Sequence, residues 1–121
     1  MRSGWLLRDG DVVCALEMAS SPAERRDALR GRSGWQGALH VTGARTVHTA
    51  GIRFPIDVAF LSDDLTVLRM TQLKPWRVAV GGRGVSSTVE SEAGSLERWG
   101  VRVGDQLEVR EAEADPSGNG S

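Results

Sequence analysis

The stretch Phe54-Pro55-Ile56-Asp57-Val58-Ala59-Phe60-Leu61 decides the fold of this 121-residue chain. Its apolar, β-branched and aromatic residues predict a buried strand, and Pro55 fits only at its start because proline cannot donate to a sheet ladder. Asp63-Asp64 then marks a turn, and residues 65–73 supply a second strand. The centre of the fold is therefore predicted to be a β-hairpin.

Shorter elements are predicted on both sides of this hairpin. Asp9-Gly10 supplies the positive φ angles of a tight turn, which predicts an N-terminal hairpin of residues 5–8 and 11–18. Ser21 as cap, Pro22 in the first turn and Glu24 in a capping box predict a helix to about Arg30, with Gly31 as its stop. Further strands are expected at 38–41, 85–90 and 106–110, with a short helix at 95–99.

Length and composition indicate one small domain, residues 1–110, followed by an acidic, Gly- and Ser-containing tail, 111–121, that we expect to be disordered. No apolar run approaches the roughly 20 residues that cross a bilayer. Charged residues interrupt the N-terminal stretch, so no export signal is predicted and the cytoplasm is the expected location. Cys14 is the only cysteine and lies in an apolar run, which favours a buried, inert thiol.

The charge pattern argues against a dedicated nucleic-acid binder. Fifteen basic and 16 acidic residues give a net charge of −1, and nearly all the basic residues are arginine. Only the predicted helix, with Arg25, Arg26, Arg30 and Arg32, is locally basic, so nucleic-acid binding through this helix is a third-ranked hypothesis.

Asp57 is the most conspicuous candidate for a functional site. A carboxylate inside a buried run needs a partner, because burying an unpaired charge is costly. If Asp57 accepts from backbone amides or from Arg53, it is a structural staple. If it faces a cleft with His48, the pair could orient a base or bind a ligand, with Thr49 nearby.

Two further positions leave alternatives open. Glu90 could approach Asp57 if their strands are neighbours, or it could be a solvated or arginine-paired edge residue. Trp76, beside Arg77 in a predicted loop, could line a ligand cleft or pack on the core. His40, His48 and Cys14 lack the spacing of metal ligands, and no nucleophile motif is present, so neither a metal nor a cofactor is expected.

The run His48-Thr49-x-Gly51-Ile52-Arg53-Phe54-Pro55-Ile56-Asp57 resembles the central signature of a bacterial and archaeal family, the domain of unknown function 192. Leu73-x-Pro75-Trp76-Arg77, Val89-Glu90 and Gly100-x-x-x-Gly104-Asp105 follow in the family's order. The resemblance implies a small compact α+β domain with a curved, mainly antiparallel sheet or partial barrel and one or two short helices. It implies no activity, and it nominates His48, Thr49, Arg53, Asp57 and Glu90 as motif positions.

The leading functional hypothesis is a small cytosolic binding module, a monomer or weak dimer, without catalytic activity. A polar cleft around His48, Arg53 and Asp57, together with Thr49, Trp76 and Arg77, would hold a small anionic ligand or a protein segment. A protein partner would require an exposed apolar patch or sheet edge beside the cleft. The alternative is a small hydrolase or isomerase in which His48 works with Asp57 or Glu90 as acid and base.

Overall fold

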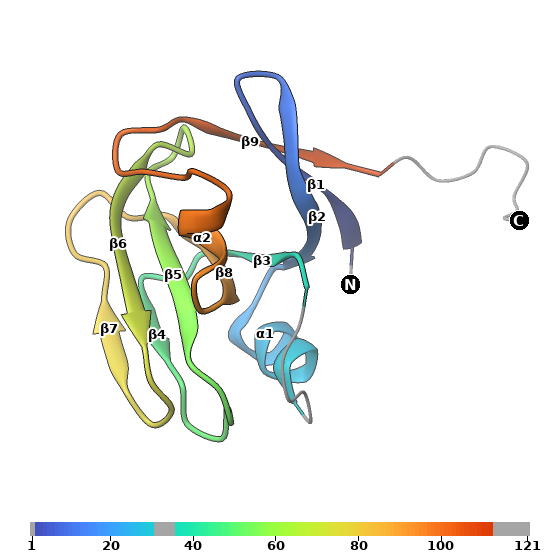
Figure 1. Ribbon diagram of the computed structural model, residues 1–121. Helices are drawn as coiled ribbons and strands as arrows, with labels where there is room; N and C mark the ends of the chain where they lie inside the picture. Colours follow the sequence, from blue (N-terminus) through green and yellow to red (C-terminus); the bar gives the residue numbers. More distant parts are fainter. Residues whose placement is uncertain (1, 31–35, 113–121) are drawn as a thin grey trace, which may run out of the picture.

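An open, curved sheet of seven strands organises the residues described by the computed structural model, 2–30 and 36–112 (Figure 1). Its strand order is β6-β5-β8-β3-β2-β1-β9, and every neighbouring pair is antiparallel except β2 and β3. The strands are β1 (Arg2–Arg8), β2 (Asp11–Ala19), β3 (Ala38–Thr42), β5 (Ile56–Leu61), β6 (Val67–Leu73), β8 (Ser87–Glu92) and β9 (Leu107–Glu111).

Core side chains fill both faces of this sheet. Ile56, Val58 and Phe60 of β5 belong to one core cluster, which extends to helix α1 (Pro22–Leu29) and to a two-stranded sheet of β4 (Thr46–His48) and β7 (Val78–Val80). Ala59 and Leu61 belong to the second cluster, which includes Leu96 of the short helix α2 (Ser95–Arg98). The α+β class is therefore confirmed, with a sheet that does not close into a barrel.

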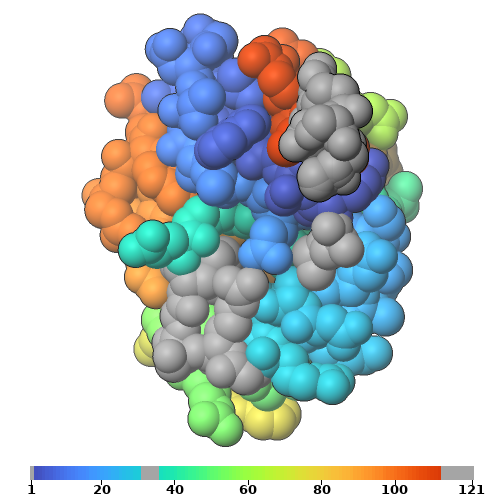
Figure 2. Space-filling model, turned by 90° about the vertical axis from the view of Figure 1, so that its right-hand side faces the viewer, coloured from blue at the N-terminus to red at the C-terminus, as the bar shows by residue number. Residues whose placement is uncertain are grey.

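Local sequence signals account for the predicted turns and caps. Asp9 and Gly10 have φ angles of 53° and 82°, as the N-terminal hairpin requires. Ser21 Oγ accepts a hydrogen bond from the Glu24 amide at 3.2 Å, and the Glu24 carboxylate accepts from the Ser20 amide at 2.7 Å. These bonds satisfy N–H groups that would otherwise lack partners in the first turn of α1. Figure 2 shows α1 in cyan below the blue N-terminal hairpin.

The β4–β7 sheet was not predicted from the sequence, and it forms one layer of the site described below. Gly81 follows β7 directly and lies against the main sheet. A Cβ atom at Gly81 would lie 2.5 Å from Cδ1 of Phe60 and 2.9 Å from Val85. Glycine is therefore required there for close packing rather than for flexibility.

The last strand pairs with the first strand of the chain. Strand β9 ends at Glu111, and the Ala112 amide donates to the Ser3 carbonyl at 2.9 Å. The predicted disordered tail from 113 onward and the predicted helix stop at Gly31 lie outside the described residues. In the part of the chain that is described, no helix is long and apolar enough to cross a membrane.

Candidate functional site

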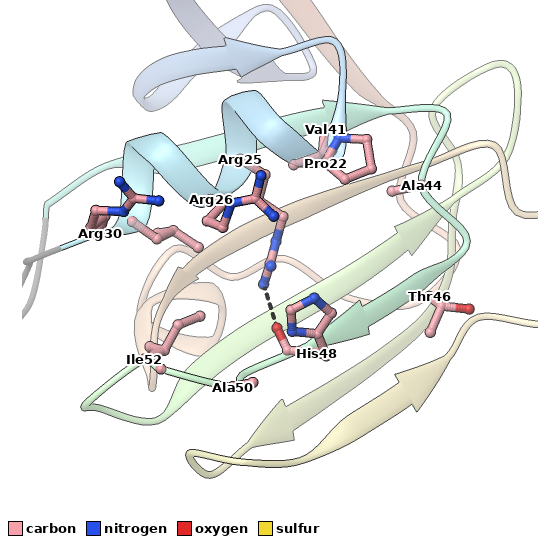
Figure 3. A pocket seen from close by; sticks show the side chains of 12 residues that line it. Pro22, Arg25, Arg26, Arg30, Val41, Ala44, Thr46, His48, Ala50 and Ile52 are labelled. Atoms are coloured by element: carbon pink, nitrogen blue, oxygen red, sulfur yellow. Dashed lines mark hydrogen bonds between the residues drawn. The ribbon is translucent and has the colours of Figure 1, made fainter.

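A cavity of about 320 Å³ lies between α1 and the segment formed by β4 and the loop that follows it. In Figure 3, arginines of α1 form one wall, and His48, Ala50 and Ile52 form the other. Apolar groups line much of the remainder, and no carboxylate is among the lining residues. The lining residues are Pro22, Arg25, Arg26, Leu29, Arg30, Val41, Ala44, Thr46, His48, Ala50, Gly51 and Ile52.

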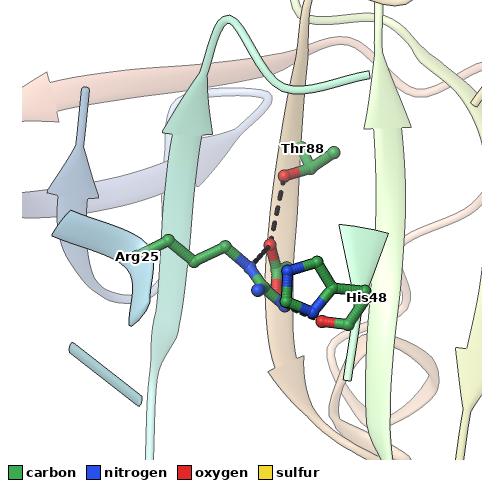
Figure 4. Close-up of polar contacts among 4 residues, drawn as sticks. Arg25, His48 and Thr88 are labelled. Carbon is green, nitrogen blue, oxygen red and sulfur yellow. Dashed lines mark hydrogen bonds and ion pairs between the residues drawn. The ribbon is translucent and has the colours of Figure 1, made fainter. Parts of the chain in front are cut away.

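A buried ion pair supports the inner end of this cavity. Arg25 of α1 donates from Nε to Glu90 Oε2 and from Nη2 to Glu90 Oε1, each at 2.8 Å (Figure 4). Thr88 Oγ1 donates to the same carboxylate at 3.3 Å. Arg25 is 7% exposed and Glu90 is fully buried, so neither charge relies on bulk water. The fork geometry lets two parallel bonds offset part of the desolvation cost.

Arg25 also connects three elements. Its Nη2 donates to the His48 carbonyl at 3.0 Å, which links α1, β8 and the end of β4. Its Nη1 has no hydrogen-bond partner among the described residues, although Arg25 lines the cavity. The guanidinium therefore links the cavity walls, and its Nη1 retains donor capacity among the described residues.

Two exposed arginines make the cavity mouth basic. Arg26 has no ion-pair partner in the described part of the chain, and Arg30 lies 4.0 Å from Asp27 with both side chains largely exposed. An exposed pair at that distance contributes little. The Arg25 charge is balanced by Glu90, so Arg26, Arg30 and His48 are the groups that can respond to an anion in the cavity.

The sequence-predicted site residues lie in different environments. His48 lines the cavity with its imidazole (Figure 3). Thr49, however, is completely buried and acts as a clamp: its Oγ1 donates to the Lys74 carbonyl at 2.7 Å and accepts from the Arg77 amide at 2.8 Å. Thr49 therefore fixes the loop between β6 and β7 and has no free group for a ligand.

Asp57 lies on the other face of the sheet from the cavity. Its Oδ2 accepts from the amides of Gly94 at 2.9 Å and Leu96 at 3.1 Å, and its Oδ1 accepts from Gln72 at 3.1 Å. These bonds satisfy N–H groups at the start of α2. Asp57 thus has the structural role considered above, but its partners are backbone amides 37 and 39 residues away rather than Arg53.

The proposed acid–base groups do not converge in the described residues. Strands β5 and β8 are neighbours, as the approach of Asp57 to Glu90 required. Val58 is directly opposite Glu90, however, and adjacent side chains of a strand point to opposite faces. Asp57 and Glu90 are therefore separated by the sheet, and each carboxylate is occupied by the structural partners described above.

Three other candidates lie away from the cavity lining. Arg53, Trp76 and Arg77 are exposed, and Trp76 is 70% exposed rather than packed on the core. The residues that sequence reasoning missed are Arg25 as the partner of Glu90, and Arg26 and Arg30 as cavity groups. The locally basic helix was the available signal, but its pattern does not reveal which arginine is buried.

Two further ionisable groups have shifted pKa values. Burial raises the pKa of the Cys14 thiol to about 11, so the thiol stays protonated and unreactive at neutral pH. Burial, aided by the nearby Arg2 charge, lowers the pKa of His40 below its usual 6.5. Within residues 2–30 and 36–112, no three His, Cys, Asp or Glu side chains cluster as a metal site would need.

The depressed pKa of His40 predicts lower stability in mild acid. As the pH falls below 6.5, His40 is protonated in the unfolded chain before it is protonated in the folded protein. Protonation therefore stabilises the unfolded state, and the free energy of unfolding falls as pH falls. We expect a loss of up to about 1 kcal/mol at about pH 5.5 relative to neutral pH. Urea titrations should show a shallower pH slope for His40→Leu than for the wild type; equal slopes would contradict the assignment.

The fold and the cavity define a small α+β domain whose sheet carries a basic cavity beside its N-terminal helix. The chain belongs to the domain of unknown function 192 family, described as "Uncharacterized ACR", whose family model matches residues 5–109. The family resemblance detected in the sequence is thereby confirmed.

Curated relatives share part of the chain. It is 43% identical over 63 residues to a UPF0127 protein of Pyrococcus furiosus and 35% identical over 63 residues to one of Pyrococcus abyssi. Each alignment covers 52% of this chain and 54% of the relative, so the chain spans about half the length of the curated relatives it matches.

Solved structures share the fold. A Sinorhizobium meliloti protein described as a "putative transcription regulator" has a TM-score of 0.75 at 21% identity, over 89% of this chain and 92% of that one. A Novosphingobium aromaticivorans protein of unknown function has a TM-score of 0.71 at 17% identity, over 89% of this chain and 84% of that one. At these identities the likeness concerns the fold alone.

Proposed function

We propose that this domain is a non-catalytic module that binds a small amphipathic anion in the cavity between α1 and β4. The observation that carries the proposal is the cavity lining itself: arginines and His48 occur beside Leu29, Val41 and Ile52, and the described lining residues include no carboxylate. Apolar walls with a few convergent polar groups are typical of small-molecule sites. An organic carboxylate with a short hydrocarbon group matches both halves of this lining.

The arrangement of the ionisable groups supports binding over acid–base catalysis. Asp57 and Glu90 are engaged on opposite faces of the sheet, so His48 lacks the carboxylate partner that the enzyme hypothesis needs. Nucleic-acid binding by the α1 arginines gains no support either, because Arg25 is buried against Glu90. The cytoplasm remains the expected compartment, in keeping with a single, shielded cysteine that cannot form an internal disulfide.

Isothermal titration with sodium octanoate tests this function. Octanoate should bind with measurable heat, while octylamine, with a similar chain and the opposite charge, should not. Arg26→Gln should weaken octanoate binding by about tenfold, because one charge-assisted hydrogen bond contributes about 1.5–3 kcal/mol. Arg26 is exposed and unpaired among the described residues, so its loss should leave the fold intact.

The matched control is Arg102→Gln, which removes another exposed arginine that is not among the residues lining the cavity. This variant should bind octanoate like the wild type. Equal affinity for octanoate and octylamine, or an unchanged affinity in Arg26→Gln, would contradict an anion site in this cavity.

A further inference from the structure

Strand β7 carries a second feature, separate from the cavity: an exposed apolar row. Trp76, Val78 and Val80 are 70%, 64% and 57% exposed, whereas Ala79 between the two valines is buried. Val78 and Val80 project from the same face of β7, because side chains alternate along a strand. We call Trp76, Val78 and Val80 the β7 row. Large apolar side chains that gather on a surface commonly mark an interaction site.

The clamp at Thr49 holds Trp76 in this exposed position. Trp76 has a φ of 60°, in the left-handed region that non-glycine residues rarely adopt. Its amide donates to the Thr49 carbonyl at 3.1 Å, and the Thr49 hydroxyl bonds to Lys74 and Arg77 on either side of it. These hydrogen bonds hold the backbone of Trp76 in a conformation that usually requires glycine, and the tryptophan side chain is exposed there.

Basic residues without acidic neighbours surround the β7 row. The sequence contains no Asp or Glu from 28 to 56 or from 65 to 89, which includes β4, β6, β7 and the loop between β6 and β7. Arg69 donates to the Val80 carbonyl, and the Gly81 amide donates to the Arg45 carbonyl, so both residues lie next to the end of β7. Lys74 and Arg77 flank Trp76 in the sequence, and Arg83 follows β7. We call Arg45, Arg69, Lys74, Arg77 and Arg83 the basic rim; in the described chain none of them forms an ion pair.

Strand β7 is also an edge strand. Its strand partner within the described residues is β4, so its other row of backbone groups is not paired with a strand, although the Val80 carbonyl of that row accepts from Arg69. An extended peptide can add to such an edge, with main-chain bonds giving affinity and alternate side chains giving specificity. Side chains of an extended peptide also alternate between two faces, so every second side chain of a bound peptide could pack beside Val78 and Val80.

From these four observations we propose that the β7 row and the basic rim bind an extended, acidic segment of a protein partner. Apolar side chains of the partner pack on Trp76, Val78 and Val80, and its carboxylates face the rim. The net charge of the domain is −1, so the surface outside the basic rim is acidic. That surface would repel a long polyanion, whereas a short acidic segment contacts only the basic rim, which favours the short segment. Arg77 and Trp76, expected from the sequence to line a ligand cleft, thus belong to a surface distinct from the cavity.

Fluorescence anisotropy with a labelled peptide of alternating glutamate and valine tests this surface. The peptide should bind, and affinity should fall as salt rises. Trp76→Ser and Lys74→Glu should each weaken binding by about tenfold or more, since aromatic and charged anchors dominate such contacts. Trp5→Ser is the matched control, because Trp5 is 46% exposed on β1 of the seven-stranded sheet, whereas β7 belongs to the two-stranded sheet. Circular dichroism of each variant verifies that it is folded.

The same assay contains the outcomes that would overturn the proposal. These are no binding of the glutamate–valine peptide, equal binding of a lysine–valine peptide, equal binding after N-methylation of alternate peptide bonds, or tighter binding of oligothymidylate. Stronger adsorption to phosphatidylserine vesicles than to the peptide would overturn it as well. Arg26→Gln, which impairs the proposed cavity site, should leave peptide binding unchanged, so the two proposals can fail separately.

Discussion

Arg25→Met is expected to lower the free energy of unfolding by about 3–5 kcal/mol, the usual cost of breaking a buried ion pair. Glu90 is fully buried, and without Arg25 its carboxylate would keep only the Thr88 hydroxyl as a hydrogen-bond partner among the described residues. Methionine retains most of the alkyl volume, so the loss reports the charge rather than a cavity. Urea denaturation at neutral pH measures this loss directly.

A double variant separates the net contribution of the pair from the cost of leaving one partner alone. Arg25→Met combined with Glu90→Leu removes both charges, and we expect it to recover most of the stability lost in Arg25→Met. Arg26→Met, one position along α1 at an exposed site, should change stability by less than about 0.5 kcal/mol. A loss in Arg25→Met as small as that of Arg26→Met would contradict the buried-pair account.

The pair also determines the shape of the cavity. Arg25 reaches from α1 to the central strand β8 and, through the His48 carbonyl, to the end of β4. Both walls of the cavity are therefore attached to one guanidinium. A ligand that bonds to Nη1 would stabilise the same group that holds the walls, so ligand binding and folding stability should be coupled.

The elements predicted correctly from the sequence are those whose signals are local. The strand expected at 54–61, which the structure shows as Ile56–Leu61, the Asp9-Gly10 turn and the Ser21 cap each depend on residues within a few positions of one another. The paired strands 56–61 and 67–73 also follow from a short connection between apolar runs. Such features need no knowledge of distant segments, because propensity and turn chemistry determine them.

The site could be predicted only in part, because it depends on contacts between distant residues. Arg25 and Glu90 are 65 residues apart, and only the strand order places β8 beneath α1. Asp57 and Glu90 are on opposite faces because of the register of β5 and β8, in which Val58 is opposite Glu90. A shift of that register by one residue would place both carboxylates on the same face. His48 lines the cavity without Arg53 or Asp57, and the burial of Thr49 depends on the loop that contains Lys74 and Arg77.

Asp57→Ala is the second substitution with a large expected effect, a loss of about 2–4 kcal/mol in the free energy of unfolding. It removes the acceptor of the Gly94 and Leu96 amides at the start of α2, and the Leu96 bond is buried. Buried N–H groups without partners cost more than the bond itself contributed. Asp57→Asn, which retains one carbonyl oxygen, should lose about 1 kcal/mol. Urea denaturation of both variants provides the measurement.

Octanoate binding by Asp57→Asn distinguishes a structural Asp57 from a ligand-binding one. Asp57 lies across the sheet from the cavity, so the folded variant should bind octanoate with the affinity of the wild type, although it unfolds at lower urea concentration. Arg26→Gln should show the reverse pattern, with weakened binding and unchanged stability. If Asp57→Asn instead lost affinity while keeping its stability, Asp57 would have to contact the ligand, and the separation of the two faces would be wrong.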